Sequence, residues 1–285
     1  MTGFAEFLRG RDASSATVDS YLRDLEKFAR WYLGTYGSDP EPASVGPLDI
    51  AEFKRSLMNR GQRSATINRA LASLSAFFRW AKDEGLASGD PTEGVKKLKE
   101  VRLSPRSLGR KEQMALMRAT QAAGRVRDVA VMTLLLHTGL RVSEVCGLNL
   151  EDVHLGERSG EVTVRFGKGA KRRTVPLNSS ARRALRAWLS ERGEAPGPLF
   201  LSQKGGRLSR RAVEYLLSAC AARARLENVT PHVLRHTFCK NLVDSGESLD
   251  RVAVLAGHAS LNTTARYTRP TVKDLRKAVD RLAWE

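Results

Sequence analysis

The sequence is poor in cysteine and has no long apolar run. Its three cysteines, Cys146, Cys220 and Cys239, are an odd number without paired spacing. This argues against a disulfide framework and favours reduced, mostly buried thiols. The longest apolar stretch, residues 129–136, is far too short to cross a bilayer, and the first residues do not resemble a signal peptide. We therefore expect a cytoplasmic protein with no membrane partner.

Internal repeats, low-complexity tracts and a Walker loop are also missing. Acidic residues are scarce: 31 Asp and Glu face 48 Lys and Arg, which gives the chain a formal net charge of +17. Such a surplus predicts a polyanionic partner, because each Lys or Arg placed on a phosphate releases condensed counterions. Charge alone leaves open a merely soluble basic surface.

The length and patterning predict two domains of an α+β protein that is mostly α with a small β-sheet. The chain has 285 residues, 41% of them hydrophobic, which is enough for a buried core in each domain. We predict a helical domain over residues 1–100, a basic linker over 101–110 and a second domain over 111–285. Residues 101–285 carry 33 basic and 17 acidic residues, against 15 and 14 in residues 1–100.

Apolar spacing predicts the main elements. Three helices are expected in the first domain, over residues 17–33, 47–61 and 64–84, with Gly34 and Gly37 ending the first and Ser64 capping the third. The second domain should begin with helices over 110–122 and 127–137. Strict alternation in 161–166, a turn at 167–170 and a return over 172–177 predict a β-hairpin, and helices resume from 179.

The segment 230–236, TPHVLRH, predicts a helix start that faces an anion. Thr230 supplies a capping oxygen, and Pro231 already has the φ angle of a first helical residue. His232 and Arg235 then project from one face of the first turn, beside the positive end of the helix dipole. A phosphate there would meet both side chains and the helix end together. We interpret His236 as a packed structural histidine.

Two further cations stand beside glycines. Arg141 follows a glycine that ends one helix and opens the next, where a guanidinium can be held rigidly and can bind two phosphate oxygens. Lys168 lies between two glycines at the hairpin turn, which lets it approach a ligand closely. A surface arginine and a generic basic loop remain alternatives for these two positions.

The segment 249–268 combines a helix end with a tyrosine. Gly257 is placed to end the apolar helix 249–256, which leaves His258 clear of it. Tyr267 follows nine residues later beside Arg266, an unusual setting for a core tyrosine; a surface aromatic stacked on arginine is the alternative. His232 and His236 have a spacing compatible with zinc, but no third ligand is evident. We expect no metal and no cofactor.

In this order the segments resemble the tyrosine recombinase family: Arg, Lys, His-x-x-Arg, His, Tyr. The words TGLRVSEV, GKGAKRRTVPL, HVLRHTF and AGHASLNTTARYTR are similar to those of Xer recombinases and of phage and transposon integrases. The resemblance covers the whole second domain, and the first resembles the family's helical, SAM-like core-binding domain. Ala256 stands where the family usually has Leu, a conservative change.

The resemblance implies a site-specific recombinase that cuts and rejoins DNA through a 3′-phosphotyrosine, without ATP. It assigns Tyr267 as nucleophile, Arg141 and Arg235 as phosphate clamps, and Lys168 as the acid that protonates the leaving 5′-oxygen. His232 would help to deprotonate the tyrosine or bond the phosphate, and His258 would donate to the phosphate. A phenol leaves more easily than an alkoxide, so the linkage can be reversed.

The resemblance also implies double-stranded DNA as the partner and a homotetramer on synapsed DNA, or an assembly with a second, heteromeric recombinase. In the family the C-terminal tail, here 271–284, usually docks into a neighbouring protomer, and packing against its own chain is the alternative. The expected DNA contacts are basic residues of both domains: Arg63, Arg69, Arg79, Lys171, Arg172 and Arg173.

Two other activities remain as alternatives, a type IB-like topoisomerase and a catalytically silent DNA-binding regulator. The motif words disfavour the first, and the six filled catalytic positions disfavour the second. Residues 1–100 leave no room for a preceding arm-binding module, so an Xer-type or small mobile-element integrase is expected.

Overall fold

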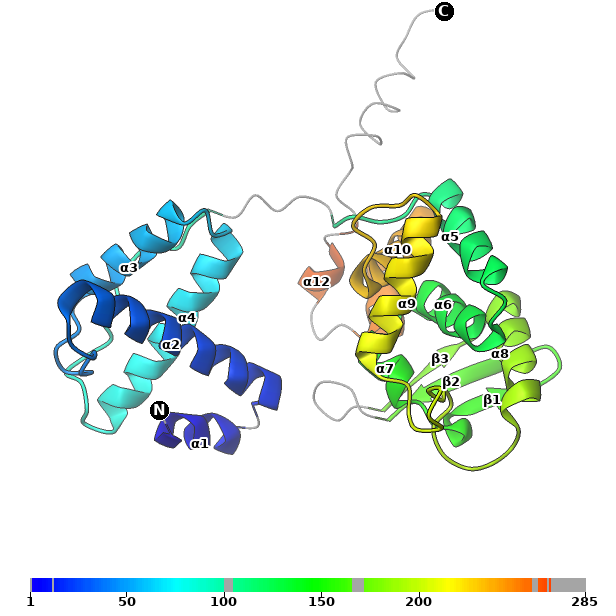
Figure 1. The fold of residues 1–285 in the computed structure, drawn as a ribbon, viewed down its shortest axis with the longest axis horizontal. Coiled ribbons are helices and arrows are strands. Elements are labelled where there is room, and N and C mark those ends of the chain that lie inside the picture. The colour runs from blue at the N-terminus through cyan, green and yellow to red at the C-terminus, as the bar shows by residue number, and fades with distance from the viewer. Residues whose placement is uncertain are drawn as a thin grey trace, which may run out of the picture. The chain divides into compact units, whose positions relative to one another are not determined.

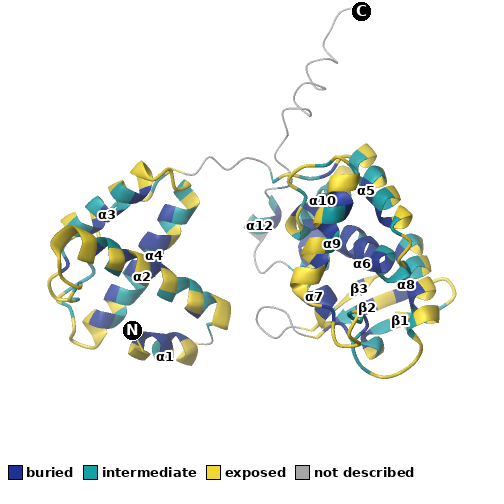
Figure 2. Cartoon of the chain, in the orientation of Figure 1, coloured by how far each residue is buried: buried dark blue, intermediate teal, exposed yellow. Residues whose placement is uncertain are grey.

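The structure, a computed structural model, describes residues 2–11, 13–99, 105–165, 172–257, 261–265 and 267. It divides into two compact units, Met1–Arg102 and Leu103–Glu285 (Figure 1). The predicted fold class is confirmed, since helices predominate beside one small sheet. Each unit encloses a buried apolar cluster of its own, drawn dark blue in Figure 2. None of the described helices is long and apolar enough to span a bilayer.

The first unit contains four helices in its described part: α1 (Thr2–Gly10), α2 (Ser15–Tyr36), α3 (Pro47–Asn59) and α4 (Ser64–Asp83). The start predicted at Pro47 is confirmed, and the side chain of Asp49 accepts the N–H of Gly46 at 2.8 Å. The core between α2, α3 and α4 is rich in aromatic rings, among them Phe28 and Phe53, whose centroids lie 5.2 Å apart.

Three details of this unit differ from the sequence prediction. Helix α1 was not predicted. Gly34 does not end α2; the helix continues to Tyr36 and ends at Gly37, whose φ of 76° is the left-handed conformation that glycine adopts readily. Ser64 is the first residue of α4 rather than its cap, which is Arg63.

The second unit is built around α6. Its helices are α5 (Arg110–Ala122), α6 (Val126–Thr138), α7 (Val142–Gly147), α8 (Ser179–Arg192), α9 (Arg210–Arg223), α10 (Pro231–Asp244), α11 (Leu249–Ala256) and α12 (Leu261–Ala265), and a 3₁₀ turn spans Leu150–Asp152. Helix α6 packs against α5, α8 and α10, and most of its residues are buried. A helix that is apolar all round fits the centre of a unit.

The sheet is antiparallel with the order β1-β2-β3, from β1 (Val153–Leu155), β2 (Gly160–Val164) and β3 (Arg173–Pro176). The predicted hairpin is confirmed, with Val162 opposite Val175 and both buried. Its turn, residues 166–171, lies outside the described residues. Strand β1 was not predicted, because three residues are too few to show an alternation.

Candidate active site

Arg141 stands at the junction between α6 and α7. Gly139 ends α6 with a φ of 62°, and a Cβ atom there would lie 2.3 Å from Cδ1 of Phe238. Only glycine fits both the backbone angle and the space. Arg141 is then the N-cap of α7, with its N–H donating to the carboxylate of Glu144 at 2.7 Å. The chain therefore holds the Arg141 backbone in a fixed place.

The start of α10 supplies the side chains of His232 and Arg235. Thr230 is its N-cap, with Oγ1 accepting the N–H of Val233 at 3.3 Å, and Pro231 is the first helical residue, as predicted. Arg235 is 5% exposed and donates from Nη1 to the carbonyl of Gly139 at 2.6 Å. This bond ties α10 to the junction that carries Arg141.

Arg235 keeps part of its hydrogen-bonding capacity unused. Its Nη2 is buried and has no hydrogen-bond partner within the described residues. Burial and the nearby charge of Arg141 lower the pKa of Arg235 from its usual value. A buried donor without a partner costs free energy, and an anion beside it would relieve that cost.

One pocket of about 430 Å³ brings these groups together. It is lined by Arg141, Val142, Ser143, Arg210, Arg211, Glu214, Pro231, His232 and Arg235. The sequence prediction placed Arg141, His232 and Arg235 at one site. Arg210 and Arg211, at the start of α9, were not singled out, although the paired arginines were visible in the sequence. Four guanidinium groups against one carboxylate make the pocket suited to a phosphate.

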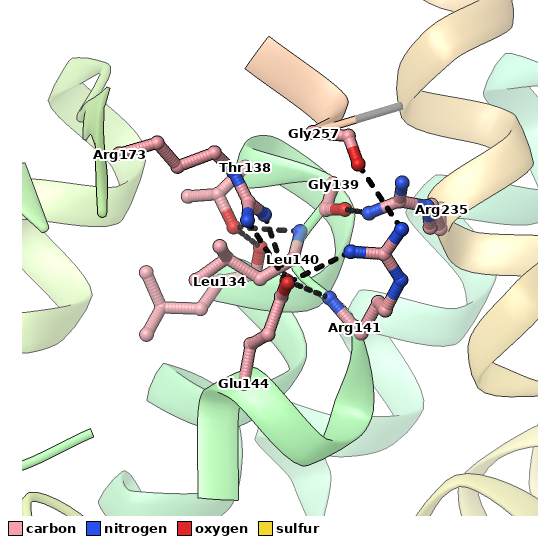
Figure 3. A network of polar contacts seen from close by, with 9 residues as sticks. All are labelled: Leu134, Thr138, Gly139, Leu140, Arg141, Glu144, Arg173, Arg235 and Gly257. Atoms are coloured by element: carbon pink, nitrogen blue, oxygen red, sulfur yellow. Dashed lines mark hydrogen bonds and ion pairs between the residues drawn. The ribbon is translucent and has the colours of Figure 1, made fainter. Parts of the chain in front are cut away.

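Next to the pocket residue Arg141, Glu144 forms an ion cluster with Arg141 and Arg173 (Figure 3). Its carboxylate accepts Nη1 of Arg141 at 2.9 Å and both Nη atoms of Arg173 at 2.9 and 2.8 Å. Burial by itself would raise the pKa of Glu144, but the hydrogen bonds from Arg173 and Arg141 and their charges outweigh it and lower this pKa. Arg141 also donates from Nη2 to the carbonyl of Gly257 at 3.1 Å.

Tyr267 lies beside α10 but does not line the pocket. It is 3% exposed and packs with Phe238, Cys239 and neighbouring apolar residues of α11. Its hydroxyl is 2.6 Å from Nδ1 of His236, the histidine that the sequence analysis interpreted as structural. The rings of His236 and His232 are 6.5 Å apart, one helical turn from each other. The sequence prediction missed the contact of His236 with Tyr267, and the spacing of the two histidines on one helix was the signal that could have indicated it.

Three of the predicted site residues lie outside the described residues: Lys168, Lys171 and His258. The segments that precede and follow them are described. Strand β3 begins at Arg173, and Gly257 ends α11 with a φ of 65°, as the sequence predicted.

The other predicted DNA contacts differ in their surroundings. Arg63 and Arg172 are exposed. Arg69 donates from Nε and Nη2 to the buried carboxylate of Asp24, at 3.0 Å each, so part of its role is to satisfy the interior of the first unit. Arg79 lies 3.8 Å from a carboxylate oxygen of Asp90. The role of these arginines in DNA binding stays a prediction.

Two family models match the chain. The Phage integrase family model matches residues 106–274, and the model of the phage integrase N-terminal SAM-like domain matches residues 1–85. The chain belongs to the phage integrase family of tyrosine recombinases. The resemblance seen in the sequence is thereby confirmed.

Similar proteins span nearly the whole recombinase. The tyrosine recombinase XerC of Stutzerimonas stutzeri (strain A1501) is 35% identical, with 98% of this chain and 94% of that protein covered. XerC of Thermodesulfovibrio yellowstonii (strain ATCC 51303 / DSM 11347 / YP87) is 35% identical, with 94% and 90% covered. Among solved structures, XerH bound to a palindromic difH substrate in a post-cleavage complex has a TM-score of 0.79 at 24% identity, with 95% and 81% covered.

Family membership settles the class of enzyme. The chain is a tyrosine recombinase, an enzyme of site-specific DNA recombination. The comparisons support neither the topoisomerase nor the silent regulator that the sequence analysis kept as alternatives. A lambda integrase fragment bound to a core site shares the recombinase's fold, with a TM-score of 0.77 at 19% identity and 100% of this chain and 96% of that one covered.

Proposed function

We propose that this recombinase cleaves double-stranded DNA with Tyr267 and binds the scissile phosphate in the pocket of Arg141, His232 and Arg235. The observation that carries the assignment of the phosphate site is the buried Nη2 of Arg235. This atom donates no hydrogen bond to another described residue, and Arg235 lines a pocket rich in cations. Fixed donors of this kind stabilise the negative charge that gathers on the non-bridging oxygens in the transition state.

The proposed step conserves the phosphodiester energy. The Tyr267 oxygen bonds to phosphorus and the bond to the 5′-oxygen breaks. Lys168 gives its proton to that oxygen, and His232 accepts the phenolic proton. His258 donates a further hydrogen bond to the phosphate. The 3′-phosphotyrosine can be attacked by another 5′-hydroxyl, which rejoins the strands without ATP.

In this account the nucleophile moves from His236 toward a phosphate beside His232. The hydroxyl of Tyr267 is bonded to His236, and His232 lies one turn further along α10. One turn is about 5.4 Å along a helix axis. Cleavage in this account requires Tyr267 to exchange His236 for the phosphate, and binding of DNA would supply the competing partner.

We further propose that the recombinase works as a homotetramer on synapsed DNA, or with a second recombinase, in the cytoplasm. Four active sites are needed to exchange the strands of two duplexes. The XerC names of relatives at about 35% identity support an Xer-type activity over that of a phage integrase with an arm-binding module.

Replacing Tyr267 tests the assignment. A DNA site is first selected by the wild-type protein from a pool of random duplexes and then prepared with a nick that traps the cleaved product. The wild type should form an adduct that survives denaturant, and Tyr267→Phe should form none while binding the same duplex. Tyr215→Phe removes a hydroxyl from an exposed tyrosine of α9 outside the pocket and should keep the adduct. An adduct formed by Tyr267→Phe would refute the assignment.

A further inference from the structure

Arg173 and Arg172 are neighbours in sequence but have different surroundings. Arg172 is exposed, whereas the side chain of Arg173, the first residue of β3, is only 14% exposed. Both Nη atoms of Arg173 donate to the buried carboxylate of Glu144. The Nε of Arg173 has no hydrogen-bond partner among the described residues, but it is buried. With both Nη atoms committed to Glu144 and Nε out of solvent, little of this guanidinium is exposed to a DNA backbone, although its basic neighbours suggested such a contact.

The Glu144 cluster joins three segments that carry catalytic candidates. Glu144 fixes Arg141 through the backbone N–H and through Nη1. Arg173 follows the 166–171 turn, which holds Lys168, along the chain. The side chain of Arg173 also packs on Gly257, where a Cβ atom would lie 2.7 Å from its Cζ. Gly257 directly precedes His258 and accepts Nη2 of Arg141.

The charges of the cluster explain why a second arginine is needed. Glu144 paired with Arg141 alone would be a neutral pair, and a phosphate would have to compete with the carboxylate for the guanidinium. Arg173 adds a second positive charge to the same carboxylate, so the cluster as a whole keeps one positive charge. Figure 3 shows Glu144 lying between the two guanidinium groups. In a partly buried site such charge interactions are strong.

We propose that Arg173 is a positioning residue, which neutralises and holds Glu144 so that Arg141 stays available to a DNA phosphate. The inference rests on the proposed function, in which Arg141 binds the scissile phosphate. Arg173 therefore has a role different from the DNA contact that the sequence predicted for Lys171, Arg172 and Arg173. Arg172 is still expected to contact DNA.

The test compares single-turnover cleavage, at saturating enzyme, with equilibrium binding of the same nicked duplex at several salt concentrations. Arg173→Gln removes the charge and keeps part of the side chain. Its cleavage rate should fall by about 10- to 100-fold, by analogy with the loss seen when a residue that orients a metal ligand is replaced. Its affinity and the salt dependence of binding should stay within about two-fold of the wild type, because no phosphate contact is lost.

Substitutions at Glu144 and at position 173 separate positioning from packing. In the Arg173→Gln background, Glu144→Gln removes the competing charge at nearly constant size. The double variant should cleave at least about ten-fold faster than Arg173→Gln alone. Arg173→Lys keeps a charge beside Glu144 and should cleave within about ten-fold of the wild type. It also provides the measurement if Arg173→Gln does not fold. Arg183→Gln, on the exposed face of α8, is the charge-matched control and should cleave normally.

Each result decides the matter. A fall in affinity of Arg173→Gln, with a salt slope lower by about one as expected for a lost phosphate contact, would overturn the proposal in favour of direct DNA binding. Failure of Glu144→Gln to restore the rate, or a loss of more than about ten-fold in Arg173→Lys relative to the wild type, would also overturn it. If the wild type itself formed no adduct, the proposed function would fail; if the wild type and Arg173→Gln cleaved equally, only the present inference would.

Discussion

At the scale of single residues, the site depends on charges that are held in place by buried partners. Arg235 is fixed by the Gly139 carbonyl, and Arg141 and Arg173 by one carboxylate. The motif order in the sequence was enough to pick out Arg141, His232 and Arg235. It could not show Glu144 between two arginines or His236 on the tyrosine, because both depend on contacts between segments far apart in the chain.

The Glu144 carboxylate should make stability depend on pH. The pKa of Glu144 is lower in the folded protein than the ordinary carboxyl pKa of 4.5. Its charge therefore contributes to the free energy of unfolding above pH 4.5, and this contribution is lost as the pH falls through the pKa of the folded state. Glu144→Gln should destabilise the second unit at pH 7, by about 3 kcal/mol, because two partly buried arginines lose the buried carboxylate that pairs with them.

Denaturant unfolding at pH 7 and at pH 4 and below measures this difference. The wild type should lose stability toward acid more steeply than the variant, so the gap between them should narrow. A gap that stays constant over the whole range would show that the Glu144 charge contributes nothing to folding.

At the scale of elements, helix ends place the site. Proline and a preceding capping residue marked the start of α10 correctly, and glycine marked the ends of α6 and α11. The same reasoning was wrong at Gly34, because α2 continues past this glycine to Tyr36, whose hydroxyl donates to Asp49 at 2.7 Å. Local signals predicted these starts and ends well. Elements as short as β1 were not predicted, because pairing within the sheet rather than a sequence pattern defines them.

Gly139 tests this dependence on helix ends. Gly139→Ala forces a side chain into a left-handed backbone and against the ring of Phe238, 2.3 Å away. We expect a loss of about 2 to 4 kcal/mol in the free energy of unfolding, from backbone strain and overpacking together. Gly124→Ala is the matched control, because it has a φ of +73° and no atom within 4 Å of the added Cβ.

Thermal and denaturant unfolding of the two variants gives the comparison. Gly124→Ala should lose only the backbone part, about 1 to 2 kcal/mol. Equal losses in both variants would mean that the contact between Gly139 and Phe238 does not constrain the junction that carries Arg141.

At the scale of the whole molecule, the net charge of +17 and the two-unit organisation agree with an enzyme that holds a polyanion. Composition predicted the kind of partner, and motif words predicted the family. The homotetramer that the resemblance implies stays a prediction, since assembly depends on surfaces of other copies. Residues 271–284, where the sequence predicts a docking tail, lie outside the described residues.

Removing the tail separates DNA binding from assembly. A chain ending at Thr271 should bind a single selected duplex with the affinity of the full chain, because the pocket and the basic surface remain. Recombination between two such duplexes should fall by at least about ten-fold, since the proposed contact between protomers is lost. Gel-shift titration and a two-duplex recombination assay measure the two quantities. Undiminished recombination by the shortened chain would eliminate the tail from assembly.

The most direct measurement for the central claim is mass-spectrometric mapping of the residue that becomes linked to DNA. The wild-type recombinase is trapped on the nicked duplex, digested with protease and nuclease, and its peptides are sequenced. The account predicts one nucleotide-bearing peptide, with the phosphate on the phenolic oxygen of Tyr267. A phosphate found on any other side chain would contradict it.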